Sequence, residues 1–163
     1  MDASAPRILR AAEGAVLGPP AAVKDRFMVD GADAGGRLAL VQHLFPPRAL
    51  AAPLHRHHRE DEYSYVLYGR IGAVLGDAEV VVEPGDLLFK PRDQWHTFWN
   101  AGDEPAALLE LISPAGLEQL FRRLDALREP PTAEQVTEMA APYGCDVDPG
   151  GTRRVIERHG LTF

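Results

Sequence analysis

Apolar and polar residues alternate along short stretches of the chain, and glycine and proline separate these stretches. Residues 37–45 show the pattern clearly, because one set (Ala39, Val41, His43, Phe45) alternates with a second set (Leu38, Leu40, Gln42, Leu44). Successive side chains of a strand point to opposite faces, and both sets are mainly apolar, so we expect a strand that is covered on both sides. The same criteria predict further strands over residues 26–30, 63–68, 71–75, 79–83, 87–90, 95–99 and 106–112. Short strands at this spacing predict an all-β barrel or sandwich.

After residue 112 the apolar period changes to that of a helix. Ser113 and Pro114 form a typical helix start, and apolar residues follow at helical spacing: Leu117, Leu120, Phe121, Leu124 and Leu127. Residues 132–135 resemble a capping box and predict a second, short helix to about Ala141. We therefore divide the chain into three parts: an arm over residues 1–25 that either pairs with another subunit or stays mobile, a barrel over residues 26–112, and a helical extension over residues 113–163.

Composition narrows the kind of partner and the compartment. The chain has 163 residues and a formal net charge of −7, which argues against nucleic acid or an anionic membrane surface as a partner. Its single cysteine, Cys145, excludes an intramolecular disulfide and fits a reducing compartment. The sequence has no apolar run of the length that a signal peptide or a membrane span needs. We expect a cytoplasmic protein whose partner is a small molecule.

His55 and His57 are the first candidates for metal ligands. In a strand their side chains project on the same side, with Cα atoms roughly 6.6 Å apart. Imidazole nitrogens bind a metal at about 2.0–2.1 Å, so both rings can converge on one ion. His58 points the other way and is expected to take no part. Alone, this cluster is equally compatible with a solvated charged loop; His43 could be a partner of the ligands, although a lone strand histidine is more often structural.

Two stretches together resemble the motifs of the cupin superfamily, Gly-x5-His-x-His-x(3,4)-Glu-x6-Gly and Gly-x5-Pro-x-Gly-x2-His-x3-Asn. From His55 to Gly69 the first motif fits in every spacing, but Ala49 replaces its leading glycine. The second runs from Gly85 to Asn100, and its internal glycine is Asp93. Aspartate tolerates left-handed backbone better than most residues, so this departure is mild. Two gapped motifs in the right order are a specific signal.

The resemblance implies a jelly-roll barrel (a double-stranded β-helix) with C-terminal helices packed on it. It also implies a metal held inside the barrel by His55, His57, Glu62 and His96. Three imidazoles and one carboxylate suit a divalent transition metal such as Fe, Ni, Mn, Cu or Zn. Glu62, the one anionic ligand, is the candidate catalytic residue, because a loosened carboxylate could take a proton from a bound hydroxyl. A homodimer through exchanged edge strands is a further expectation from the family.

Strand alternation suggests which side chains share the face of the metal ligands. Ser64, Val66 and Tyr68 are in phase with Glu62, and Phe98 is in phase with His96, so these four are candidate pocket residues. Over about residues 26–143 the chain is similar to single-domain quercetinase-type cupins. That similarity implies a dioxygenase acting on a small enol or flavonol-like metabolite. Two alternatives remain open: a non-redox metal-dependent isomerase, lyase or cyclase, and a small-molecule-binding cupin without turnover.

Overall fold

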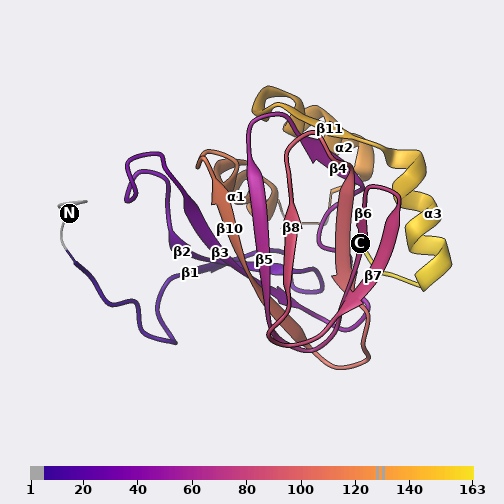
Figure 1. Cartoon of the computed structure of the whole chain (residues 1–163), viewed down its shortest axis with the longest axis horizontal. Helices are drawn as coiled ribbons and strands as arrows, with labels where there is room; N and C mark the ends of the chain where they lie inside the picture. The colour runs from indigo at the N-terminus through magenta and orange to yellow at the C-terminus, as the bar shows by residue number, and fades with distance from the viewer. Residues whose placement is uncertain (1–5, 128, 130) are drawn as a thin grey trace.

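The computed structural model describes residues 6–127, 129 and 131–163, which form two antiparallel β-sheets around a common interior (Figure 1). The six-stranded sheet has the order β1-β2-β3-β10-β5-β8, and the five-stranded sheet has the order β11-β4-β9-β6-β7. The strands of the first sheet are β1 (Ala15–Leu17), β2 (Lys24–Val29), β3 (Ala39–Phe45), β5 (Asp61–Tyr68), β8 (Leu87–Lys90) and β10 (Ala106–Ser113). Those of the second are β4 (His55–His57), β6 (Ile71–Leu75), β7 (Ala78–Val82), β9 (His96–Asn100) and β11 (Cys145–Val147).

The jelly-roll fold expected from the sequence is confirmed, and every strand predicted from alternation is present with its ends within two residues of the prediction. β3 shows why the pattern was informative. One of its two alternating sets is buried throughout, with Ala39 and Val41 fully buried, Phe45 2% exposed and His43 5% exposed, and the other set is half-buried. Apolar side chains from both sheets, including Val66, Phe98 and Leu108, fill the interior next to Phe45.

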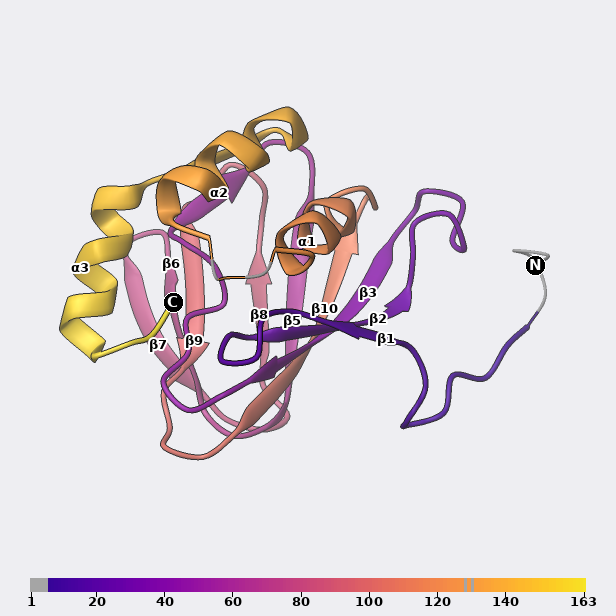
Figure 2. The same cartoon turned by 180° about the vertical axis from the view of Figure 1, so that it is seen from behind.

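The helices lie along one side of the barrel, as Figure 2 shows. They are α1 (Glu118–Asp125), α2 (Ala133–Ala140) and α3 (Pro149–His159). The capping box of α2 is confirmed, because Thr132 accepts a hydrogen bond from the Gln135 backbone and the Gln135 side chain accepts one from the Thr132 backbone. The predicted helix start at Ser113 is wrong: β10 continues through Ser113, which pairs with Asp61, and α1 begins at Glu118.

Two short strands fall in segments for which no strand was predicted. β1 lies in the proposed arm and pairs with β2 of the same chain, and β11 lies in the proposed helical extension and pairs with β4. Residues 1–5 of the arm and residues 128 and 130 of the linker after α1 lie outside the described residues. The boundaries between arm, barrel and extension stay a prediction.

Helix α3 packs against the outer side of the five-stranded sheet through Trp99. The Trp99 indole is 2% exposed and stacks on the His159 ring with a centroid distance of 4.6 Å. Gly72 of the neighbouring strand leaves room for it, since a Cβ at this position would lie 2.3 Å from the indole. None of the helices in the described part of the chain combines the length and apolar character that a membrane span requires.

Candidate metal centre

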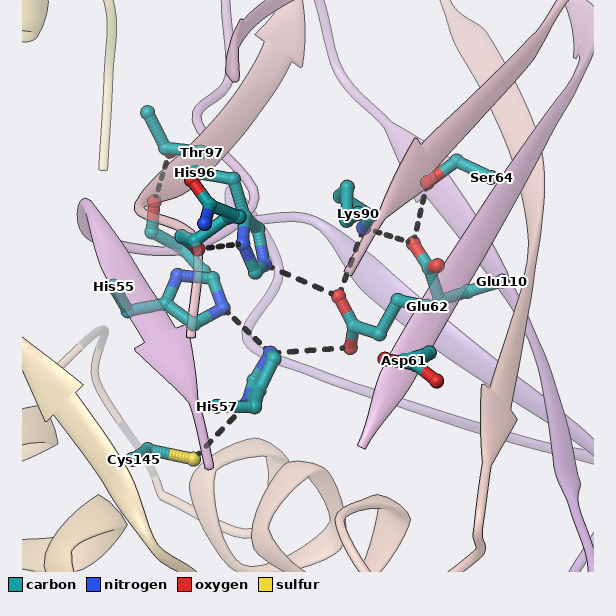
Figure 3. Close-up of polar contacts among 12 residues, drawn as sticks. His55, His57, Asp61, Glu62, Ser64, Lys90, His96, Thr97, Glu110 and Cys145 are labelled. Carbon is teal, nitrogen blue, oxygen red and sulfur yellow. Dashed lines mark hydrogen bonds and ion pairs between the residues drawn. The ribbon is translucent and has the colours of Figure 1, made fainter. Parts of the chain in front are cut away.

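Three strands bring the predicted ligands together at one end of the barrel interior (Figure 3). His55 and His57 are the first and last residues of β4 and project on the same side, His96 is paired directly with His55 at the start of β9, and Glu62 lies near the start of β5. One donor atom from each of the four side chains lies within 4.8 Å of all the others. His55 is partly buried, and the other three are at most 2% exposed. The structure therefore places all four candidates in one cluster.

The far nitrogen of each imidazole is held by a neighbour, which orients the near nitrogen. The Nδ1 of His55 lies 2.7 Å from the carbonyl oxygen of Pro53, and the Nδ1 of His96 lies 3.0 Å from that of Gln94. Both must donate, because a carbonyl oxygen only accepts, and their Nε2 atoms then carry lone pairs. The Nδ1 of His57 lies 3.1 Å from the Cys145 sulfur. Such outer contacts fix the tautomer and ring direction of metal-binding histidines.

The inner atoms of the cluster satisfy one another only in part. The Nε2 atoms of His55 and His57 are 3.1 Å apart, and the Glu62 carboxylate lies 3.4 Å from the Nε2 of His57 and 3.3 Å from that of His96. The buried Nε2 of His96 has no hydrogen-bond partner among the described residues. Converging lone pairs and one carboxylate are the donor set that a divalent transition metal takes, so the residues fit such an ion.

Protonation alone satisfies this cluster poorly. Burial would lower the pKa of His57, but Glu62 and the Cys145 contact raise it to about 10. Burial and the neighbouring rings of His96 and His57 hold the pKa of His55 well below its usual value. The pKa of His96 is also lowered, chiefly by burial. One ring can hold a proton beside Glu62, but the other two cannot, whereas a single cation would bind all four groups.

A buried lysine that the sequence analysis did not single out supports Glu62. The Nζ of Lys90 lies 2.9 Å from Glu62 and 2.7 Å from Glu110, whose carboxylate also accepts a hydrogen bond of 2.7 Å from Ser64. Although burial raises the pKa of Glu62, the Lys90 ammonium and His57 hold it well below its usual range. Alternation in β8 puts Lys90 on the inner face with Leu88, which was the available signal, but its partners follow only from the pairing of Lys90 with Glu62.

A cavity of about 280 Å³ leads to the cluster, and His55, His57 and Glu62 form part of its wall. Of the four candidate pocket residues, Phe98 lines this cavity, whereas Ser64, Val66 and Tyr68 do not. Ser64 is fully buried against Glu110, and Val66 is part of the apolar core. Tyr68 is 46% exposed, because the pairing of β5 with β10 skips one residue after Val66 and this irregularity ends the alternation. The predicted inward position of Tyr68 is therefore wrong.

His58 lies outside the cluster, as expected. Its ring points to the surface, with Nδ1 2.6 Å from Asp93 and Nε2 3.0 Å from Asp146. Asp93 has a φ of +65°, the left-handed conformation for which the family pattern uses glycine. The predicted tolerance of aspartate at this position is confirmed, and the Asp93 side chain anchors His58.

Comparison with known proteins agrees with this architecture. Residues 41–112 match the family model described as a cupin domain. KdgF from Halomonas sp. aligns with 71% of this chain and 99% of its own, with a TM-score of 0.60 and 19% identity. A predicted oxalate decarboxylase from Thermotoga maritima aligns with 66% of this chain and 99% of its own, with a TM-score of 0.62 and 19% identity.

A putative sugar phosphate isomerase from Acidithiobacillus ferrooxidans gives a TM-score of 0.53 at 22% identity, over 65% of this chain and 74% of its own. At such identities the similarity concerns the fold. Comparison with curated proteins by sequence gives no match. Residues 41–112 thus match the cupin-domain model, carry both histidine-bearing motifs, and lie in a fold that these solved structures share.

Proposed function

We propose that this chain is a metal-dependent enzyme that binds a small oxygen-bearing molecule at an ion held by His55, His57, Glu62 and His96. The observation that carries the proposal is the convergence of three imidazole nitrogens and one carboxylate within 4.8 Å at the wall of a cavity. A bound Fe, Ni, Mn, Cu or Zn ion would supply Lewis acidity, and the redox-active ones among them could also use dioxygen.

The protein's own groups have separable tasks in this proposal. The outer contacts of the three histidines orient their rings, and Lys90 keeps Glu62 ionised and in place. The role of Glu62 as a proton acceptor stays a prediction, and the nearby Lys90 ammonium makes this carboxylate less basic. Phe98 and the apolar side chains of α1 that line the cavity exclude water from the bound molecule.

For the reaction we favour a dioxygenase that acts on a small enol or flavonol-like metabolite. Support comes from the resemblance to quercetinase-type cupins and from the aromatic and apolar cavity wall, which includes Phe98, Phe121 and Leu120. A flat, weakly polar molecule with an enol oxygen would match both the metal ion and the apolar wall of such a site.

A non-redox isomerase, lyase or cyclase is the second candidate, because the same four ligands can polarise a hydroxyl or carbonyl oxygen without electron transfer. The shared fold with a protein named as a putative sugar phosphate isomerase makes this class worth testing. A binding protein without turnover is the third candidate.

The test combines metal analysis with oxygen measurement. Untagged protein is analysed for bound metals, and then assayed with flavonols and small enols in an oxygen electrode, with His96→Ala as the control that loses a ligand. We expect about one transition-metal ion per chain and oxygen uptake that the control lacks. Product without oxygen uptake would select the non-redox class, and metal without turnover would select the binding protein. Failure to bind a stoichiometric metal would overturn the proposal.

We also propose that the chain forms a homodimer, in which the outer face of β5 and β8 is buried. Tyr65, Leu87 and Phe89 on this face are 45%, 58% and 50% exposed, and β8 is an edge strand. Exposed apolar side chains at a sheet edge favour association with a second copy. Light scattering of the wild type and of Leu87→Lys tests this, and a monomeric wild type would contradict it.

A further inference from the structure

The cavity has a second group of charged side chains, separate from the four metal-ligand candidates. Asp25 of β2, His43 of β3 and Asp125 of α1 all line it. The Nδ1 of His43 lies 2.6 Å from the Asp25 carboxylate, and both residues are buried, at 5% and 7% exposure. Only His43 of these three lies within the part of the chain that matches the family. The flanking segments therefore complete this group.

Two polar atoms of the group have no partner among the described residues. The buried Nε2 of His43 has no hydrogen bond, and a Glu110 oxygen 3.9 Å away is too far to accept one. The buried Oδ2 of Asp125 also has none. A buried polar atom without a partner costs about 1–3 kcal/mol, so both atoms call for an explanation.

We propose that His43 and Asp125, with Asp25 as the support of His43, form a second binding subsite that holds a hydroxyl group of the ligand. This inference names a substrate class for the proposed function and rests on it for the metal end of the same molecule. Nothing in the metal-ligand cluster uses these three residues, and they line the cavity in which the four candidate ligands lie.

The charges around the subsite favour a neutral group. An anion would face the carboxylates of Asp25 and Glu110, and a cation would face His43 and the Lys90 ammonium. A hydroxyl group avoids both conflicts, because it can accept a hydrogen bond from the Nε2 of His43 and share one with the Asp125 carboxyl. Burial alone would lower the pKa of His43, but Asp25 and Glu110 raise it, so the ring can carry the proton that it donates.

The surroundings indicate what carries that hydroxyl. The rings of Phe98 and Phe121 each lie 5.7 Å from the His43 ring, centroid to centroid, and both line the cavity. Leu120 and Leu124 of α1 complete an apolar wall near Asp125. Aromatic rings pack well on a flat apolar body. The expected ligand is therefore a hydroxylated aromatic or conjugated molecule that carries this hydroxyl in addition to its metal-binding oxygen atoms.

Phenol and toluene are matched probes for this subsite, because they differ in size little and only phenol carries a hydroxyl group. Binding is followed on the full chain with ¹⁵N-labelled histidine, both as purified and after chelation of metal, through the Nε2 resonance of His43. We expect phenol to shift this resonance saturably and to bind about tenfold more tightly than toluene, the size expected for one or two hydrogen bonds.

Variants at Asp125 test which residue provides the preference. Asp125→Leu should weaken phenol binding about tenfold and leave toluene binding no weaker, because only phenol uses the carboxyl group. Asp125→Asn keeps a hydrogen-bonding side chain of the same shape and should retain part of the preference. Glu134→Leu, an equivalent change at an exposed position of α2, is the control and should bind both probes as the wild type does.

The result that would overturn the subsite is equal binding of phenol and toluene, no phenol-dependent shift of His43, or full preference in Asp125→Leu. Its failure can be told apart from failure of the proposed function. Phenol preference in a protein that binds no stoichiometric metal would support the subsite and remove the metal enzyme. Metal binding with turnover but without phenol preference would support the metal enzyme and remove the subsite.

Discussion

Two groups of side chains on the cavity wall are similar in type, yet they are built in different ways. The candidate metal centre takes three histidines and Glu62 from strands β4, β5 and β9, all within residues 41–112. The other group combines His43 of β3 with Asp25 and Asp125, which lie on either side of that region. The four candidate metal ligands thus lie within the residues that match the cupin model, whereas Asp25 and Asp125 lie outside them.

The pKa of a buried carboxyl group is shifted in opposite directions in the two groups. At the candidate metal centre, Lys90 and His57 hold the pKa of Glu62 well below its usual value despite its burial. In the other group, burial and the nearby Asp25 raise the pKa of Asp125 to about 8, and His43 and Arg122 only partly offset them. Position relative to a cation, and not residue type, decides whether the pKa of a buried carboxyl falls or rises.

The largest effect should follow from loss of a ligand at the candidate metal centre. We expect His57→Ala or His96→Ala to lower metal affinity by more than the roughly 10–100-fold that loss of an outer partner costs. His58→Ala should bind metal as the wild type does, because His58 contacts Asp93 and Asp146 at the surface. Metal titration of the three variants measures this. Equal losses in all three would show that the two faces of β4 are wrongly assigned.

Lys90→Met should cost about 3–5 kcal/mol of unfolding free energy, because it leaves two carboxylates, Glu62 and Glu110, buried without their cation. Urea unfolding of metal-free protein gives the value, and bound metal should reduce the loss by neutralising Glu62. The double variant Lys90→Met/Glu110→Gln, which also removes the Glu110 charge, should recover part of the lost unfolding free energy. Lys24→Met in β2 is the matched control at a half-buried position. A loss as small as the control's would show that Lys90 does not stabilise the candidate metal centre.

Cys145→Val removes the neighbour of His57 Nδ1 and should weaken metal binding by about tenfold, since outer partners orient ligating histidines. Cys145→Ser, which can still form a hydrogen bond, should lose less. Competition with a coloured chelator resolves differences of this size. If the Cys145→Val and Cys145→Ser variants bind metal equally well, the sulfur contact has no orienting role.

The last effect concerns Asp125 and depends on pH. Its raised pKa means that the folded chain keeps a proton which the unfolded chain has lost between about pH 4 and pH 8, so the wild type loses stability as the pH rises through this range. Asp125→Asn cannot ionise, and its stability relative to the wild type should increase over the same range. Thermal melts at several pH values test this, with Glu134→Gln as control. A difference that does not vary with pH would place Asp125 in contact with water.

The four candidate metal ligands could be predicted from the sequence, because short-range patterns within two segments of the chain indicate them. Period-two alternation placed His55 and His57 on one face, and the two spaced motifs indicated Glu62 and His96. The contacts of Lys90 with Glu62 and Glu110 depend on strand register, which no short pattern records. The proximity of Asp125 to Asp25 depends on how α1 packs over the barrel.

Other differences from prediction have equally specific causes. One skipped residue in the pairing of β5 with β10 turned Tyr68 outward, and a single irregularity of this kind has no composition signal. Strand β11 has three residues, too few for alternation to be recognised. Ser113 and Pro114 have the chemistry of a helix start, but pairing with β5 keeps Ser113 in the sheet.

Because Trp99 stacks on His159, its fluorescence should report whether α3 is docked on the barrel. The chain has two tryptophans: Trp99 contacts His159 of α3, while Trp95 lies under Arg56, whose neighbours in β4 are the candidate ligands His55 and His57. Replacing either indole by phenylalanine would leave a single emitter. Detachment of α3 and changes at the candidate metal centre could then be followed separately, each by fluorescence of one single-tryptophan variant.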